Sequence, residues 1–130
     1  MAWSKTTWAN LRGTNTTSVE VAPSGTTGGN IDCAGANKFI SLAVRVSALF
    51  DTAPNKAARV DFYGYNADAA DVDADTIAIY TADIPQHTTS EEIATYQVNV
   101  SALDQMRIVV TNLDTTKSIW VHVSYQAGYW

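Results

Sequence analysis

The chain has 130 residues, of which 46% are hydrophobic and 16% charged, and its formal net charge is −5. This length fits one domain, and the apolar content excludes an intrinsically disordered chain. The acidic balance argues against nucleic acid as the main partner, and the single cysteine, Cys33, excludes an internal disulfide.

The first part of the chain has a charge opposite to that of the rest. Residues 1–17 hold Lys5 and Arg12 and no acid, so they carry +2 and residues 18–130 carry the remaining −7. The segment is also rich in threonine and lacks the apolar core of a signal peptide. We therefore expect an extended N-terminal arm, 1–17, that precedes a folded body, 18–130, in a chain used without export.

Large aromatic residues stand at both extremes of the chain, where polar residues ordinarily fray. They are Trp3, Trp8, Tyr129 and Trp130. Aromatic ends suggest docking, either on this domain or on a neighbouring subunit, and the plain alternative is that they cap a small core. With Arg12, these residues are predicted to form an interface.

From residue 38 onward the hydrophobic residues alternate with period two, which is typical of half-buried strands. Strands are predicted at 39–49, 59–66, 76–82, 93–101, 106–112 and 118–127, with earlier ones at 18–22 and near Ile31. Seven or eight strands predict an all-β fold, a single antiparallel β-sandwich that is jelly-roll-like. An immunoglobulin-like topology is the alternative, because periodicity does not determine strand order.

Three segments between these strands carry turn residues. Glycine and proline predict a loop at 23–30, and a turn is predicted at 51–56. A second turn at 112–117 is predicted to join the last two strands into a hairpin. In the strand at 76–82, Ile77 and Ile79 are predicted to point inward.

One acidic loop has the spacing of a calcium site. Asp71, Asp73 and Asp75 match the first three ligand positions of an EF-hand loop, and calcium takes several oxygen ligands. The match then fails, because Thr76 and Ala82 stand where that loop needs glycine and glutamate. A solvated acidic loop is the default interpretation, and no cofactor is expected.

The last strand has an aromatic outer face. Trp120 and His122 share it with Ser124 and Gln126. This face could be a sugar-stacking platform, a subunit contact or an edge covered by the arm. We favour the last two interpretations.

The sequence holds no catalytic motif. No glycine-framed serine elbow is present, and Cys33 has no local signature around it. Glu91 and Glu92 are adjacent, so in a strand they point to opposite faces and form no acid/base pair. We predict that the chain is not an enzyme.

The arrangement resembles that of small structural proteins of tailed bacteriophage virions, namely capsid decoration, or cement, proteins and head-fibre proteins with a β-sandwich body. Three parts of the chain carry this resemblance: the threonine-rich arm at 2–17, the entry into the first long strand at 32–42, and the apolar segment 107–125 with the sequence TNLDTT at its turn. No catalytic residue is implied by it.

The resemblance implies a protein that folds in the host cytoplasm and attaches to the virion, where it stabilises the shell or presents a surface. Its implied partners are the major capsid protein, other virion proteins and copies of itself, with a trimer favoured, and neither nucleic acid nor membrane. Two alternatives stay open. One is a carbohydrate-binding module with Trp120, Tyr63, Tyr65 or Tyr80 as its stacking face. The other is a self-polymerising tube or filament subunit.

Overall fold

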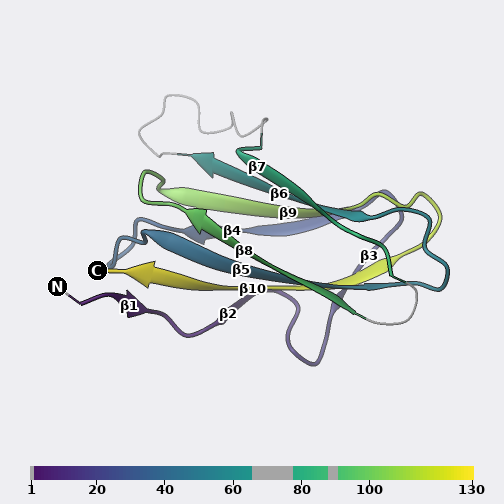
Figure 1. Ribbon diagram of the computed structural model, residues 1–130, viewed down its shortest axis with the longest axis horizontal. Coiled ribbons are helices and arrows are strands. Elements are labelled where there is room, and N and C mark those ends of the chain that lie inside the picture. Colours follow the sequence, from purple (N-terminus) through teal and green to yellow (C-terminus); the bar gives the residue numbers. More distant parts are fainter. Residues whose placement is uncertain (1, 66–77, 88–90) are drawn as a thin grey trace.

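The computed structural model describes residues 2–65, 78–87 and 91–130 (Figure 1). These residues form ten strands in two antiparallel sheets that pack as a sandwich, with no helix among them. The prediction of an all-β, jelly-roll-like sandwich is confirmed. None of the described residues belongs to a helix that could span a membrane. The calcium candidates Asp71, Asp73 and Asp75 lie outside the described residues.

One sheet has six strands and is organised around β10. Its main path runs β1 (Ser4–Lys5), β10 (Ile119–Tyr129), β5 (Ser41–Phe50), β8 (Glu92–Asn99), and β2 (Ala9–Arg12) and β3 (Val19–Val21) also pair with β10. Strand β10 is therefore an inner strand, with β5 along one side and three short strands along the other.

The other sheet has four strands. Its order is β4 (Thr26–Asp32), β9 (Gln105–Asn112), β6 (Ala58–Tyr65), β7 (Tyr80–Ile84). The predicted strands at 39–49, 59–66, 93–101, 106–112 and 118–127 correspond to β5, β6, β8, β9 and β10.

The core lies between the two sheets and is built from alternate residues of the long strands. Its largest fully buried side chains include Leu42, Phe62, Met106, Ile108 and Ile119. Because successive side chains in a strand point to opposite faces, burying one set leaves the intervening set on the outside of the sandwich. Many of the buried core residues are β-branched, which suits a strand; they include Val44 and Val46 of β5 and Val121 and Val123 of β10.

The first seventeen residues, predicted as an arm, lie partly along β10 of the same chain (Figure 1). Ser4 pairs with Tyr129 and Asn10 with Ser124. Leu11 packs against the core and approaches β4, since a Cβ placed on Gly29 would lie 2.8 Å from its Cδ1 atom. The segment thus covers the side of β10 that β5 leaves open and closes one side of the sandwich.

The predicted hairpin at 112–117 is wrong. Strand β9 belongs to the four-stranded sheet and β10 to the six-stranded sheet, so the turn crosses between sheets. Two buried polar side chains hold the crossing. Asn112 Nδ2 donates to the carbonyls of Lys117 at 2.7 Å and Val21 at 3.2 Å, and Asp114 accepts the backbone N–H groups of Thr116 and Lys117. The apolar faces of β9 and β10 consequently meet across the core.

Two further predictions are corrected. The segment 23–30 is not a loop throughout, because β4 begins at Thr26. Its glycines serve close packing, as a Cβ on Gly28 would lie 2.2 Å from the carbonyl oxygen of Ile108. Ile79 does not point inward, since β7 begins only at Tyr80 and Ile79 is 56% exposed. Ile77 lies outside the described residues.

Candidate functional site

The outer surface of the six-stranded sheet, here called the polar face, carries the hydrophilic side chains of β5, β8 and β10. These side chains point outward because the alternate residues of the same strands are buried in the core. Read from β10 through β5 to β8, its rows are Gly128–Ser41–Asn99, Gln126–Ala43–Gln97, Ser124–Arg45–Thr95 and His122–Ser47–Ile93. Amides and hydroxyls thus stand side by side across three strands.

A first hollow of about 310 Å³ lies over two of these rows. Trp3, Lys5, Ser41, Gln97 and Gln126 contribute to its lining. Gln126 Nε2 donates to the carbonyl oxygen of Thr6 at 2.9 Å, which holds this amide in place and leaves its own carbonyl oxygen as an acceptor.

A second hollow of about 220 Å³ lies further along the same face. Arg45, Ser47, Glu91 and His122 line it together with the loop that joins β2 to β3. That loop turns at Gly13, whose φ of +72° is favourable for glycine. His122 Nε2 lies 2.7 Å from Oδ1 of Asn10 in β2, so the imidazole is hydrogen-bonded to the N-terminal segment.

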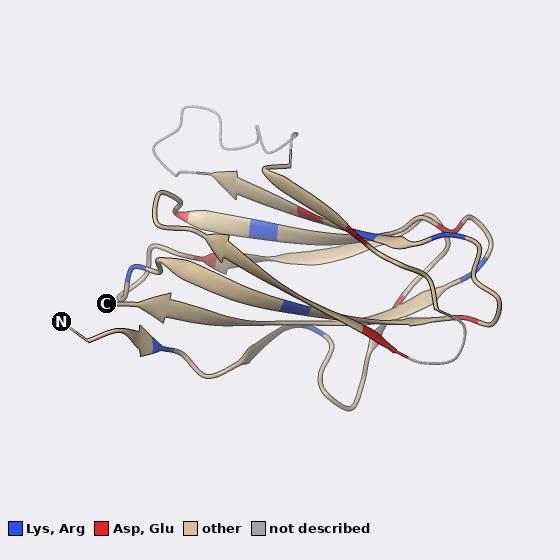
Figure 2. Cartoon of the chain, in the orientation of Figure 1, with Lys and Arg blue, Asp and Glu red and all other residues tan. Residues whose placement is uncertain are grey.

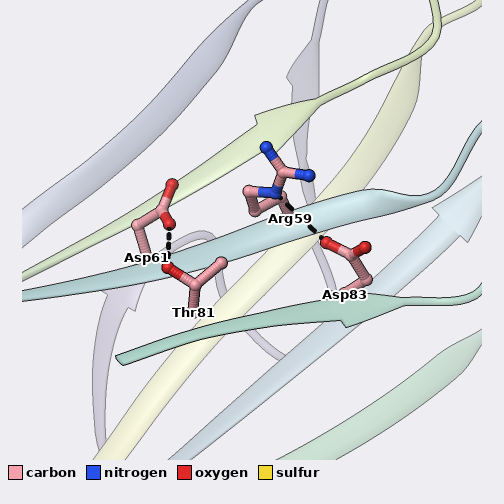
Figure 3. A network of polar contacts seen from close by, with 4 residues as sticks. All are labelled: Arg59, Asp61, Thr81 and Asp83. Carbon is pink, nitrogen blue, oxygen red and sulfur yellow. Dashed lines mark hydrogen bonds and ion pairs between the residues drawn. The ribbon is translucent and has the colours of Figure 1, made fainter. Parts of the chain in front are cut away.

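The two outer faces of the sandwich differ in whether their charged side chains have hydrogen-bond or ion-pair partners. On the four-stranded sheet, Arg59 Nε lies 3.2 Å from Asp83 Oδ1, and Thr81 donates to Asp61 at 2.6 Å (Figure 3). On the polar face, neither Lys5 nor Arg45 makes a side-chain hydrogen bond or ion pair with any other described residue. Strand β10 itself carries no charged residue (Figure 2).

An aromatic tip stands where the two ends of the chain lie side by side (Figure 1). It consists of Trp3, Phe39, Tyr129 and Trp130. The rings of Trp3 and Trp130 meet edge to face at 5.2 Å, and those of Phe39 and Tyr129 lie 6.4 Å apart. Trp3 is 42% and Trp130 59% exposed, so the tip presents apolar surface to its surroundings.

The predicted interface residues fall into three places. Trp3, Tyr129 and Trp130 are brought together in the aromatic tip, Trp120 and His122 lie on β10, and Trp8 and Arg12 are exposed on the N-terminal segment. The contact of His122 with Asn10 matches the interpretation of a strand covered by the arm.

The four rings that the sequence offered for the stacking face of a carbohydrate-binding module do not lie on one surface. Trp120 lies on the outside of the six-stranded sheet, whereas Tyr63 lies on the outside of the four-stranded sheet, where Arg107 sits 4.9 Å from its ring. Tyr80 packs instead against the rings of Phe62 and Tyr96. The strand order thus separates Trp120 from Tyr63 and Tyr65, which share β6 of the other sheet.

Sequence reasoning missed the roles of Lys5 and Gln97 in the first hollow. The outward position of Gln97 could have been read from the alternation of apolar residues in 93–101, whereas the sequence around Lys5 has no such alternation. The proximity of these two residues could not have been read, because it requires β1 and β8 to flank the β10–β5 pair, and these strands are remote in sequence.

Cys33 lies apart from both hollows and is buried. Burial raises the pKa of its thiol from 9.0 to about 11, against the opposing effect of Lys38. The Lys38 ammonium donates to the carbonyls of Val100, at 3.1 Å, and Leu103. Among the described residues, no group of three or more His, Cys, Asp or Glu side chains could hold a metal ion.

No protein-family model matches the sequence, and no curated protein matches it. The fold is similar to that of solved structures at low identity. A bacteriophage CBA120 tailspike protein 4 enzymatically active domain aligns at TM-score 0.58 and 15% identity, covering 95% of this chain and 19% of that one. A family 16 carbohydrate-binding module aligns at TM-score 0.51 and 10% identity, covering 83% and 74%.

A third similar structure, of infectious bursal disease virus strain Gx, aligns at TM-score 0.51 and 12% identity, covering 98% of this chain and 32% of that one. The chain therefore spans a fifth of the tailspike chain and a third of the viral chain. Both viral structures and carbohydrate-binding modules share this β-sandwich, and at such identities the likeness concerns the fold alone.

Proposed function

We propose that this chain is a non-enzymatic structural protein of a phage virion, which decorates and stabilises the capsid through aromatic contacts. The observation that carries the proposal is the aromatic tip. Trp130 is 59% exposed and rests edge to face on Trp3, which leaves a preformed apolar anchor. Buried aromatic anchors contribute much of the binding energy at protein interfaces.

The N-terminal segment contributes to this contact in a particular way. Ser4 and Lys5 pair with β10, and that pairing presents Trp3 beside Trp130. A tip held in place before binding loses less conformational entropy than a loose tail. A lattice repeats such a contact many times, so a modest interface suffices for firm attachment.

The proposed partners are the major capsid protein, other virion proteins and further copies of this chain, with a trimer favoured, and the proposed location is the virion. The chain acts in this role by binding, without catalysis and without a cofactor. Its net charge of −5 supports a protein partner over nucleic acid.

The test is cosedimentation of the purified chain with capsids of the virus that encodes it. We expect the chain to pellet with the capsids and Trp130→Ala to weaken attachment at least tenfold. Ile79→Ala, which removes a side chain of similar exposure that is not part of the aromatic tip, is the matched control. If the chain did not pellet, the virion role would fail. Equal attachment of Trp130→Ala and the unchanged chain would exclude the tip as the contact.

Carbohydrate binding is the second candidate function, and the polar face is the observation that favours it. The first hollow has a volume within the range of small-ligand sites, and amide, hydroxyl and indole side chains line it. These groups suit a ligand that is rich in hydroxyls. A screen of polysaccharides for retarded migration in native gels tests this candidate independently of any capsid.

A further inference from the structure

We propose that the polar face binds an acidic polysaccharide, with Lys5 and Arg45 contacting its carboxylates and Gln97 and Gln126 contacting its hydroxyls. This inference rests on the second candidate function, carbohydrate binding, and is independent of attachment to a virion. It places the site on the outside of the six-stranded sheet, away from the aromatic residues of the other sheet.

The geometry favours an extended ligand. Lys5 pairs with Gly128 and Arg45 with Ser124, so the two cations are four residues apart along β10. At the usual rise of a strand this separation is roughly 13 Å. Lys5 lines the first hollow and Arg45 lines the second. Along β10, the row that contains Arg45 lies between the rows under the first hollow and the row of His122. A chain-like molecule laid along the strands would reach both.

The charges favour an acidic ligand. Among the described residues that line the two hollows, the cations Lys5 and Arg45 outnumber the acids, of which Glu91 is the one present. Neither cation is engaged by another described residue, in contrast to Arg59 on the opposite sheet, which pairs with Asp83. A guanidinium presents a planar set of donors that matches a carboxylate in a bidentate manner, whereas an ammonium acts as a point charge.

The neutral groups favour a sugar. An amide side chain offers both donors and an acceptor, as does a sugar hydroxyl. Gln126 is hydrogen-bonded to Thr6, and Gln97 lines the same hollow. The two amides therefore lie on either side of β5, where both can contact a sugar hydroxyl. Trp3 supplies an apolar wall at the end of the hollow, where it lies against Gly128.

Two other acidic ligands fit less well. Nucleic acid carries a regular array of phosphates and requires many cations, whereas the described lining of the two hollows has two, in a chain of net charge −5. An acidic peptide offers carboxylates without the hydroxyls that the amides would contact. The experiment therefore includes an acidic peptide beside the saccharides.

The experiment measures affinity by calorimetry for three probes: oligogalacturonate, which is acidic and hydroxylated, dextran, which is neutral, and poly-L-glutamate, which is acidic without sugar hydroxyls. We expect oligogalacturonate alone to bind, and binding to weaken as salt increases. Arg45→Ala and Lys5→Ala should each raise the dissociation constant about tenfold, and Arg45→Lys should recover part of the loss.

Arg59→Ala is the matched control, since it removes an arginine from the opposite sheet and should leave the dissociation constant unchanged. Equal binding of poly-L-glutamate would overturn the assignment, because charge alone would explain it. Binding of dextran but not of oligogalacturonate would overturn the acidic class and keep carbohydrate binding. If no saccharide bound, both this inference and the second candidate function would fail, whereas the virion role would be unaffected.

Discussion

Trp3 lies directly over Gly128, because a Cβ placed on that glycine would be 2.1 Å from Cζ2 of the indole. The contact joins β1 to β10 and brings together the two features of functional interest. Trp3 is a wall of the first hollow and also the neighbour of Trp130 in the aromatic tip. One residue without a side chain thus allows the N-terminal segment to sit closely on the last strand.

The first prediction concerns this contact. Gly128→Ala should displace Trp3 and loosen β1, because the methyl group and the indole cannot occupy the same space. We expect a loss of about 1 kcal/mol in the free energy of unfolding and faster hydrogen exchange at residues 4–6. Indole fluorescence should report the change.

The matched control for this variant is Gly35→Ala, where the nearest atom to an added Cβ is Asp32 Oδ2 at 3.7 Å. It should leave both the fluorescence and the exchange rates unchanged. If Gly128→Ala behaved like Gly35→Ala, the close seating of Trp3 would be contradicted.

The second prediction concerns the N-terminal segment as part of the sandwich. Leu11→Ala should lower the free energy of unfolding by about 2 kcal/mol, since Leu11 packs against the core and against Gly29. Chemical denaturation measures this change. Leu49→Ala removes a leucine that is 43% exposed and should cost much less. Equal effects of the two variants would indicate that the segment is a loose arm in solution.

The third prediction concerns pH. Backbone N–H groups of Asn55, Thr116 and Lys117 donate to the Asp114 carboxylate and lower its pKa from 3.8 to about 2. A depressed folded-state pKa contributes stability that is complete above the unfolded value and is lost as the pH falls toward the folded value. The free energy of unfolding should therefore fall between about pH 4 and pH 2.

Asp114→Asn tests this dependence. It should be less stable than the unchanged chain at neutral pH, because its amide turns a donor toward N–H groups that need an acceptor. It should also lose less stability between about pH 4 and pH 2. Asp83→Asn, which removes an exposed carboxylate, should have little effect at neutral pH. The same acid slope in Asp114→Asn would refute the assignment.

The fourth prediction concerns Cys33. Raising the pKa of its thiol from 9.0 to about 11 lowers the thiolate fraction at pH 8 about 100-fold, and burial adds a steric barrier. We expect Ellman's reagent to label the native chain at least 100-fold more slowly than the chain in guanidinium chloride. Similar rates in both conditions would show that the thiol is accessible in the folded state.

The local pattern of the sequence was sufficient for much of the fold. Alternating apolar residues predicted β5, β6, β8, β9 and β10 to within a few residues, because each long strand buries one face in the core. The sequence predicted a strand near Ile31 but missed the earlier part of β4, because Gly28 and Gly29 resemble loop residues although they permit close approach of neighbouring groups. The same ambiguity concealed the crossing at 112–117, since turn residues do not reveal which sheet the next strand will join.

The sequence by itself determined the all-β class, the outward direction of Arg45, His122 and Gln126, and the aromatic character of both chain ends. Only the tertiary structure decided which outward residues share a surface. It separated Trp120 from Tyr63, gathered Lys5 and Gln97 over one hollow and seated Trp3 on Gly128. The physical reason is that alternation is a local property of each strand, whereas neighbourhood across a sheet depends on pairing between segments far apart in the chain.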